Sequence, residues 1–125
     1  MLRKISFGLV ALVLMLGMST AAFAQKSAVV RVVTVKTDNA AGYAQALEAG
    51  KEIMKRVGLS VTVHVYQASY AGAETGTVVA TIEFPSMVAL AEGEAKLRAD
   101  KDYQAWIKTL DKIRTIISDS IYREL

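Results

Sequence analysis

Cysteine is absent from the 125-residue sequence, and proline, tryptophan and histidine each occur only once. Without cysteine, the chain can form neither a disulfide framework nor a thiolate metal site. A single histidine, His64, cannot supply a metal site built from several histidines of one chain. A small domain without disulfides depends on its apolar core for stability, and dimerisation would bury additional surface.

The first 24 residues have the three-part layout of a secretory signal peptide. Two basic residues precede an apolar run over residues 5–18, and residues 22–24 form the A-x-A pattern of a cleavage site. The run is short for a membrane span of roughly 20 residues, and no cysteine follows it that could carry a lipid anchor. We therefore expect a protein secreted to the bacterial periplasm, with one domain over residues 25–125 and no membrane segment after cleavage.

The charge of the expected mature chain is close to neutral. The whole sequence has 15 basic and 12 acidic residues, and two of the basic ones, Arg3 and Lys4, belong to the leader. A nucleic-acid partner requires a concentrated basic face. The even balance of charges therefore argues against nucleic acid as a partner.

Changes in hydrophobic period predict the element order β-α-β-β-α-α-β. Strands are expected over residues 28–39, 60–69, 77–84 and 113–123, and helices over residues 40–57, from Ser86 and from Asp100. The last segment also fits helical spacing, but its β-branched residues favour a strand with Ile113, Thr115, Ile117 and Ile121 on one side. This order predicts a ferredoxin-like α+β fold, with an antiparallel sheet and helices on one face.

The central hairpin predicts two different sheet faces. Val61, Val63 and Val65 should lie beneath the helices with the apolar positions of residues 78–84, because a one-residue slip would mix apolar and polar side chains. The opposite face is too polar for a core and too aromatic for a fully solvated surface. The candidate ligand-binding residues of this face are Thr62, His64, Tyr66, Thr81 and Glu83, with Arg31 added if the first strand presents it on the same side.

Residues 60–110 contain a recognisable pattern: Gly72 and Gly76 in a loop, Glu83-Phe84 at a strand end, Ser86, Leu97 to Asp100, and the aromatic pair Tyr103 and Trp106. In this pattern the segment resembles the NIPSNAP-like branch of the dimeric α+β barrel superfamily. The resemblance implies a homodimer in which the two sheets face each other. Members of this superfamily include cofactor-independent monooxygenases, haem-binding or haem-degrading enzymes and proteins of no known activity, so the fold alone does not select a function.

His64, Tyr66 and Glu83 are the candidate catalytic residues. A histidine can act as a general base or a metal ligand, but without a motif a structural role in a dimer interface is favoured for His64. For Glu83, an ion pair with Arg31 or a helix cap is favoured over catalysis. A haem could use one histidine as its axial ligand, but no second feature supports it. We therefore expect neither a metal nor another cofactor.

The leading functional prediction is a secreted homodimer with a cavity between its sheets for a small, partly apolar molecule. Two alternatives stay open at this point. One is an enzyme similar to the cofactor-independent monooxygenases that uses His64, Tyr66 and Glu83. The other is a structural or protein-interaction module, and the residues do not decide whether the protein is an enzyme.

Overall fold

The computed structural model describes residues 28–125, which form a four-stranded antiparallel sheet with three α-helices on one of its faces. The elements are β1 (Val29–Lys36), α2 (Ala40–Arg56), β2 (Thr62–Gln67), the short 3₁₀ helix η1 (Gly72–Glu74), β3 (Val78–Phe84), α3 (Met87–Ala99), α4 (Lys101–Asp111) and β4 (Thr115–Arg123). The predicted α+β class and element order are confirmed. The predicted signal peptide, residues 1–24, lies outside the described residues.

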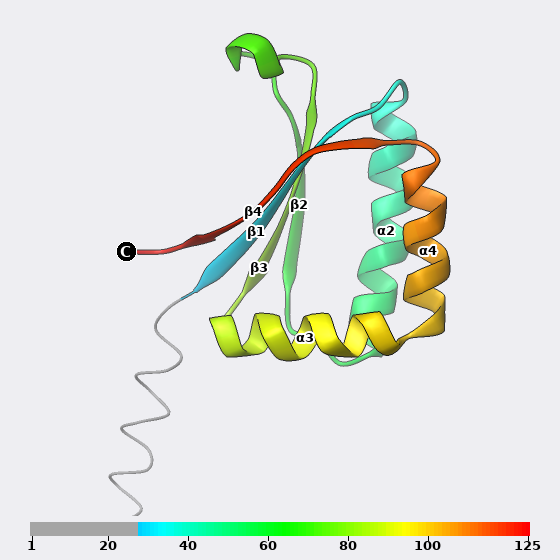
Figure 1. Ribbon diagram of the computed structural model, residues 1–125, viewed down its shortest axis with the longest axis vertical. Coiled ribbons are helices and arrows are strands. Elements are labelled where there is room, and N and C mark those ends of the chain that lie inside the picture. Colours follow the sequence, from blue (N-terminus) through cyan, green and yellow to red (C-terminus); the bar gives the residue numbers. More distant parts are fainter. Residues whose placement is uncertain (1–27) are drawn as a thin grey trace, which may run out of the picture.

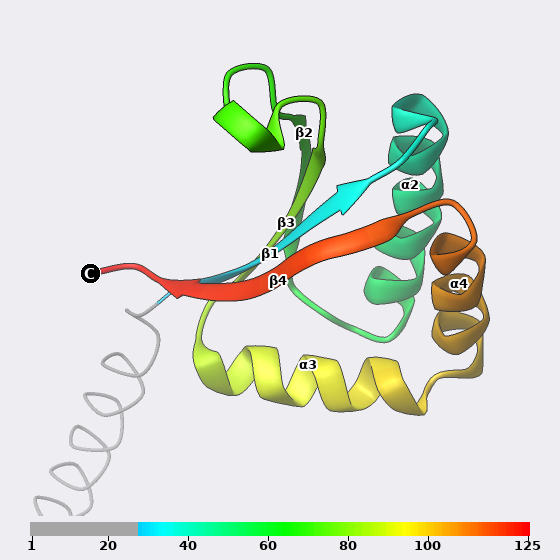
Figure 2. The same ribbon diagram turned by 45° about the horizontal axis from the view of Figure 1, so that its top comes forward.

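The helices form one layer against the sheet (Figures 1 and 2). Helices α2 and α4 lie side by side, and α3 runs across their ends. The strand order is β2-β3-β1-β4, and β1 pairs antiparallel with both β3 and β4. The two edge strands are therefore β2 and β4, and the face opposite the helices, hereafter the open face, is covered by no described element.

Helix boundaries follow from capping side chains. Asn39 caps α2 by accepting a hydrogen bond from the Gly42 amide at 2.9 Å, and Asp100 caps α4 by accepting one from the Tyr103 amide at 2.9 Å. The hydroxyl of Ser86 caps α3 in the same way. These are the helix starts that the sequence predicts, so capping chemistry determines where each helix begins.

The core has two parts that correspond to the two helix directions. The larger part lies between the sheet and helices α2 and α4, and consists of Val33, Val35, Tyr43, Leu47, Val78, Ala80 and Leu110. The smaller part lies under α3 and consists of Val29, Phe84 and Leu90. Among the described residues, no helix is long and apolar enough to cross a membrane.

Strand β4 contains an irregularity that changes which side chains share a face. Its register against β1 shifts between Thr34 and Val35, so that Ile116 pairs with Val35 while Ser118 pairs with Thr34. Ile117 is the extra residue of this β-bulge. The predicted strand is confirmed, but the prediction that Thr115 and Ile121 share one side is wrong, because the bulge reverses the alternation between them.

Candidate functional site

The structure brings five of the predicted site residues together on the open face. Thr62 lies opposite Glu83, and His64 lies opposite Thr81, across the β2–β3 ladder. Tyr66 follows on the same face, with its ring centroid 6.0 Å from that of His64. The predicted register of the hairpin is therefore confirmed. Whether these five residues bind a ligand stays a prediction.

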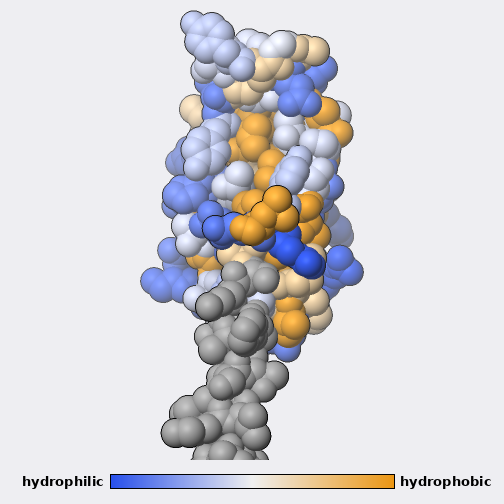
Figure 3. All heavy atoms as spheres, turned by 90° about the vertical axis from the view of Figure 1, so that its left-hand side faces the viewer, coloured by the Kyte–Doolittle hydropathy of each residue, from blue (hydrophilic) through white to orange (hydrophobic). Residues whose placement is uncertain are grey.

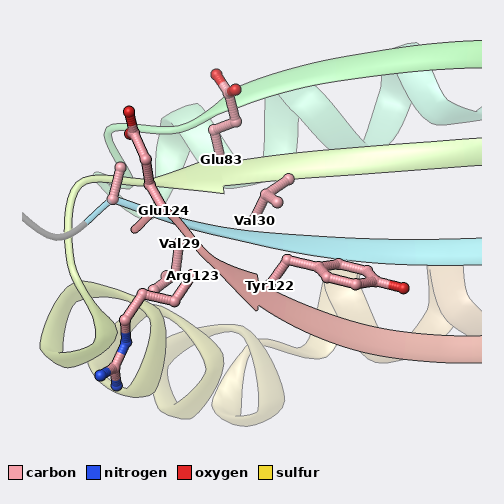
Figure 4. Close-up of a pocket in the computed structure, with 7 residues that line it drawn as sticks. Val29, Val30, Glu83, Tyr122, Arg123 and Glu124 are labelled. Atoms are coloured by element: carbon pink, nitrogen blue, oxygen red, sulfur yellow. The ribbon is translucent and has the colours of Figure 1, made fainter.

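The open face has a mixed surface. Apolar and polar side chains alternate over it (Figure 3), and Tyr66 and Tyr122 expose 55% and 59% of their surface. At one end of this face a hollow of about 240 Å³ is lined by Val30, Glu83 and Tyr122 from three neighbouring strands, while Arg123 extends toward α3 (Figure 4). Aromatic residues are enriched in protein interfaces, so the exposed tyrosines favour a contact of this face with another molecule.

Arg31 does not belong to the open face, and the prediction that placed it there is wrong. Its ladder partner is Ile82, which shares a face with the buried Ala80 and Phe84. The side chain therefore extends toward the helices. The favoured ion pair between Arg31 and Glu83 is also wrong, because the two residues lie on opposite faces of the sheet.

Arg31 is instead fixed by two carboxylates. Its Nε and Nη2 donate to the two carboxylate oxygens of Asp119 on β4, at 2.9 and 2.6 Å, and its Nη1 donates to Glu94 on α3. The hydrogen bond to Asp119 is the main cause that raises the pKa of Arg31, and the same bond lowers the pKa of Asp119. A bidentate pair of this kind restrains the plane of the guanidinium group.

Beside this cluster lies a pocket of about 50 Å³ between the sheet and helices α2 and α4, hereafter the interior pocket. Its wall is mostly apolar, with Val33, Leu47, Ala80, Ile82, Trp106 and Ile107 among its lining residues. Polar side chains reach it from Arg31, Asp119, Tyr43, Tyr103 and Arg114. Ligand sites in proteins commonly combine an apolar wall with a few such polar groups.

Two further contacts define the polar part of the interior pocket. Arg114 lies in the connection between α4 and β4, with its side chain 8% exposed, and its Nη1 donates to the hydroxyl of Tyr43 at 3.2 Å. Burial, with a smaller contribution from the charge of Glu94, raises the pKa of Tyr103 above its usual value. The Tyr103 hydroxyl therefore stays protonated at neutral pH and can donate a hydrogen bond.

Close packing brings the single tryptophan to the interior pocket. Trp106 donates from its indole nitrogen to the backbone oxygen of Ala46 at 2.8 Å, so its ring lies against α2. The ring occupies the space that a side chain at Gly50 would need. Tyr103 packs next to it, with ring centroids 5.6 Å apart. This packing of the aromatic pair is compatible with its second role in lining the pocket.

Sequence reasoning missed Glu94, Arg114, Asp119 and Tyr43 as members of this site. The sequence did contain one signal for a buried polar cluster, because Arg31 is a charged residue within a run of β-branched residues. A charge at such a position is expected to have a partner if it is buried. The partner could not be identified without the fold, because Glu94 and Asp119 lie 63 and 88 positions away in the chain.

Comparison with protein-family models finds no match, and comparison with curated proteins finds none either. Solved structures do match. A NIPSNAP family protein from Agrobacterium tumefaciens is similar over 79% of this chain and 90% of its own, with 18% identity and a TM-score of 0.60. An uncharacterised NIPSNAP-like domain protein from Burkholderia xenovorans is similar over 81% and 85%, with 16% identity and a TM-score of 0.61.

SnoaB from Streptomyces nogalater, described as a cofactor-independent oxygenase, is similar over 79% of this chain and 94% of its own, with 10% identity and a TM-score of 0.61. At these levels of identity the likeness concerns the fold. The described chain therefore has the ferredoxin-like α+β fold that NIPSNAP family proteins share with SnoaB, as the sequence resemblance predicts.

Proposed function

We propose that this protein binds a small, largely apolar molecule in the interior pocket and acts as a secreted homodimer whose subunits associate through their open faces. The observation that carries the proposal is the composition of the pocket, in which two arginines and a buried tyrosine meet an otherwise apolar wall. A wall of this composition orients a ligand through a few polar contacts and stabilises it by apolar burial. The proposed binding uses only side chains of this chain and requires no cofactor.

The structure supports the interior pocket over the predicted cavity between sheets as the ligand site. The five open-face candidates lie on a surface that the single chain leaves exposed, whereas the interior pocket is lined on several sides by strands and helices of one chain. Its volume of about 50 Å³ is several times the roughly 10–15 Å³ that a cavity needs to hold one water molecule, so it suits a molecule of a few heavy atoms. A larger ligand would require movement of the walls.

The proposed dimer rests on the composition of the open face. Tyr66 and Tyr122 are more than half exposed, and Val30, Val32 and Val79 add apolar surface between them. Aromatic residues are enriched in protein interfaces relative to other surfaces. A second copy of the chain would cover these side chains and bring His64 into the interface, which is the structural role favoured for this residue.

An oxygenase-like activity at the open face is a second candidate function. It is supported by the contact between His64 and Tyr66, with ring centroids 6.0 Å apart, and by the fold that the chain shares with SnoaB. In a covered dimer interface, His64 could act as a general base with Tyr66 and Glu83 nearby. If so, His64→Ala would abolish turnover while leaving the dimer intact, whereas unchanged turnover would reject this candidate.

Native mass spectrometry of protein purified from the periplasm tests the main proposal. The expected result is a dimer that starts at Gln25 and retains a small molecule. Ala80→Val should reduce ligand retention, because Ala80 lines the interior pocket and two added methyl groups occupy part of its volume. The matched control is Ala105→Val on an exposed position of α4. Equal retention by both variants would contradict the proposed site.

Light scattering at micromolar concentration tests the dimer separately. Tyr66→Asp on the open face should produce monomers, because it places a charge in the proposed interface. Val88→Asp is the matched control, since Val88 is 64% exposed on α3, away from the open face. A monomeric wild-type protein, or a dimer that tolerates Tyr66→Asp as well as Val88→Asp, would refute the proposed interface.

A further inference from the structure

The charges around the interior pocket compensate one another within the protein. Arg31 is paired with Asp119 and Glu94, and Arg114 is paired with Asp111. Two guanidinium groups therefore face three carboxylates. An anionic ligand would have to compete with the carboxylates that already occupy both arginines.

A cationic ligand fits no better. Asp119 is the only carboxylate among the lining residues of this pocket in the described chain, and both of its oxygens accept hydrogen bonds from Arg31. A cation would also lie close to two guanidinium groups, which repel it. The interior pocket therefore disfavours a net charge of either sign on its ligand.

The arginines and tyrosines that line the pocket have unused hydrogen-bond donors. A guanidinium group has five N–H donors and no acceptor. Arg31 and Arg114 each have donors beyond those in the hydrogen bonds described above. Since arginine can only donate, the hydroxyl oxygen of Tyr43 accepts from Arg114, and its proton stays available. The protonated hydroxyl of Tyr103 adds a further donor.

From this pattern we infer that the ligand of the interior pocket is a small uncharged molecule with an apolar body and one oxygen acceptor, such as a ketone or aldehyde carbonyl. Arg114 and Tyr103 donate hydrogen bonds to its oxygen, and the apolar wall covers the remainder. This inference rests on the proposed function and specifies the class of ligand. It requires no change in the protonation of the protein and no covalent step.

The test uses three probes of nearly equal size that differ in charge: 2-butanone, propionate and 2-butylammonium. Because Trp106 is the only tryptophan and lines the pocket, its single indole N–H signal in the NMR spectrum reports occupancy directly. The full mature chain is titrated with each probe. The expected result is a saturable shift of the indole signal with 2-butanone, and at least tenfold weaker binding of both charged probes.

Variants test the assigned donors. Tyr103→Phe removes only a hydroxyl, and Arg114→Met removes the guanidinium group. Each should weaken the binding of 2-butanone, by several-fold for the phenol and by about tenfold or more for the charged donor. The matched control is Arg98→Met, because Arg98 is 80% exposed and does not line the pocket. If Arg114→Met fails to fold, Tyr103→Phe and the comparison of probes still decide the question.

The possible outcomes separate this inference from the proposed function. Saturable binding of propionate or 2-butylammonium at least as tight as that of 2-butanone would overturn the ligand class and leave the pocket as the binding site. No saturable response to any probe would overturn both the inference and the assignment of the interior pocket as a small-molecule site. Unchanged 2-butanone binding in Tyr103→Phe and Arg114→Met would overturn the assigned donors.

Discussion

Replacement of Gly50 by alanine tests how Trp106 reaches the interior pocket. Gly50 lies in the buried stripe of α2, and a Cβ added there would come closer than 3.0 Å to three ring atoms of Trp106. The ring cannot move freely, because its nitrogen is bonded to the backbone oxygen of Ala46. The substitution therefore forces either the ring or the helix to shift.

Two opposing effects determine the stability of Gly50→Ala. Alanine in a helix interior is more favourable than glycine by about 1 kcal/mol. Overpacking of a well-filled core costs about 1–3 kcal/mol, and the overlap with three ring atoms places this site toward the upper end. We expect the free energy of unfolding to fall by about 1–2 kcal/mol. Because Trp106 lines the interior pocket, ligand binding should weaken as well.

Urea denaturation followed by circular dichroism measures this change. Ala49→Gly, at the exposed neighbouring position, measures the effect of helix propensity alone and should cost about 1 kcal/mol. With Trp106→Leu already present, Gly50→Ala should become neutral or stabilising, because the overlapping ring atoms are gone. A Gly50→Ala protein as stable as the wild type, with Trp106 intact, would refute the reasoning.

Two further predictions concern pH. The pKa of Asp119 is lowered in the folded protein because of its hydrogen bond to Arg31. This pairing therefore stabilises the folded protein above about pH 4, and the stabilisation is lost as the pH falls through the folded pKa. Asp119→Asn should lower the free energy of unfolding at neutral pH by up to about 1 kcal/mol. The variant should also lose less stability than the wild type as the pH falls, and equal losses in the two proteins would contradict this prediction. The pKa of Tyr103 is raised, so the folded protein retains this proton more strongly, and stability should fall as the pH rises above about 10. Tyr103→Phe should flatten that alkaline decline in a series of Tm measurements, and an unchanged slope would show that Tyr103 does not cause it.

Much of the fold could be predicted because local patterns agreed with the global arrangement. The period of α2, the caps Ser86 and Asp100 and the alternation of the β2–β3 hairpin each have a local physical cause. The hairpin could be assigned to its two faces because its polar and apolar residues alternate strictly. These features required no knowledge of distant contacts.

The face of Arg31 could not be predicted, because β1 is apolar on both sides. Its sequence VVRVVTVK contains valines in both alternation phases, so the period gives no preference for either face. Arg31 is placed by partners from α3 and β4 that only the folded chain brings near. The interior pocket was missed for the same reason, since its polar residues come from five segments and share no local motif.

The bulge at Ile117 gives strand β4 one residue that its pairing with β1 does not need. Ile116 and Asp119 both line the interior pocket although an odd number of positions separates them. This is compatible with strand geometry only because one extra residue lies between them. Deletion of Ile117 would restore regular alternation and leave Ile116 and Asp119 two positions apart, so both would still lie on the helix side of the sheet. Asp119 would keep its place beside Arg31 and Tyr122 would stay on the open face, so both proposed surfaces should survive this deletion.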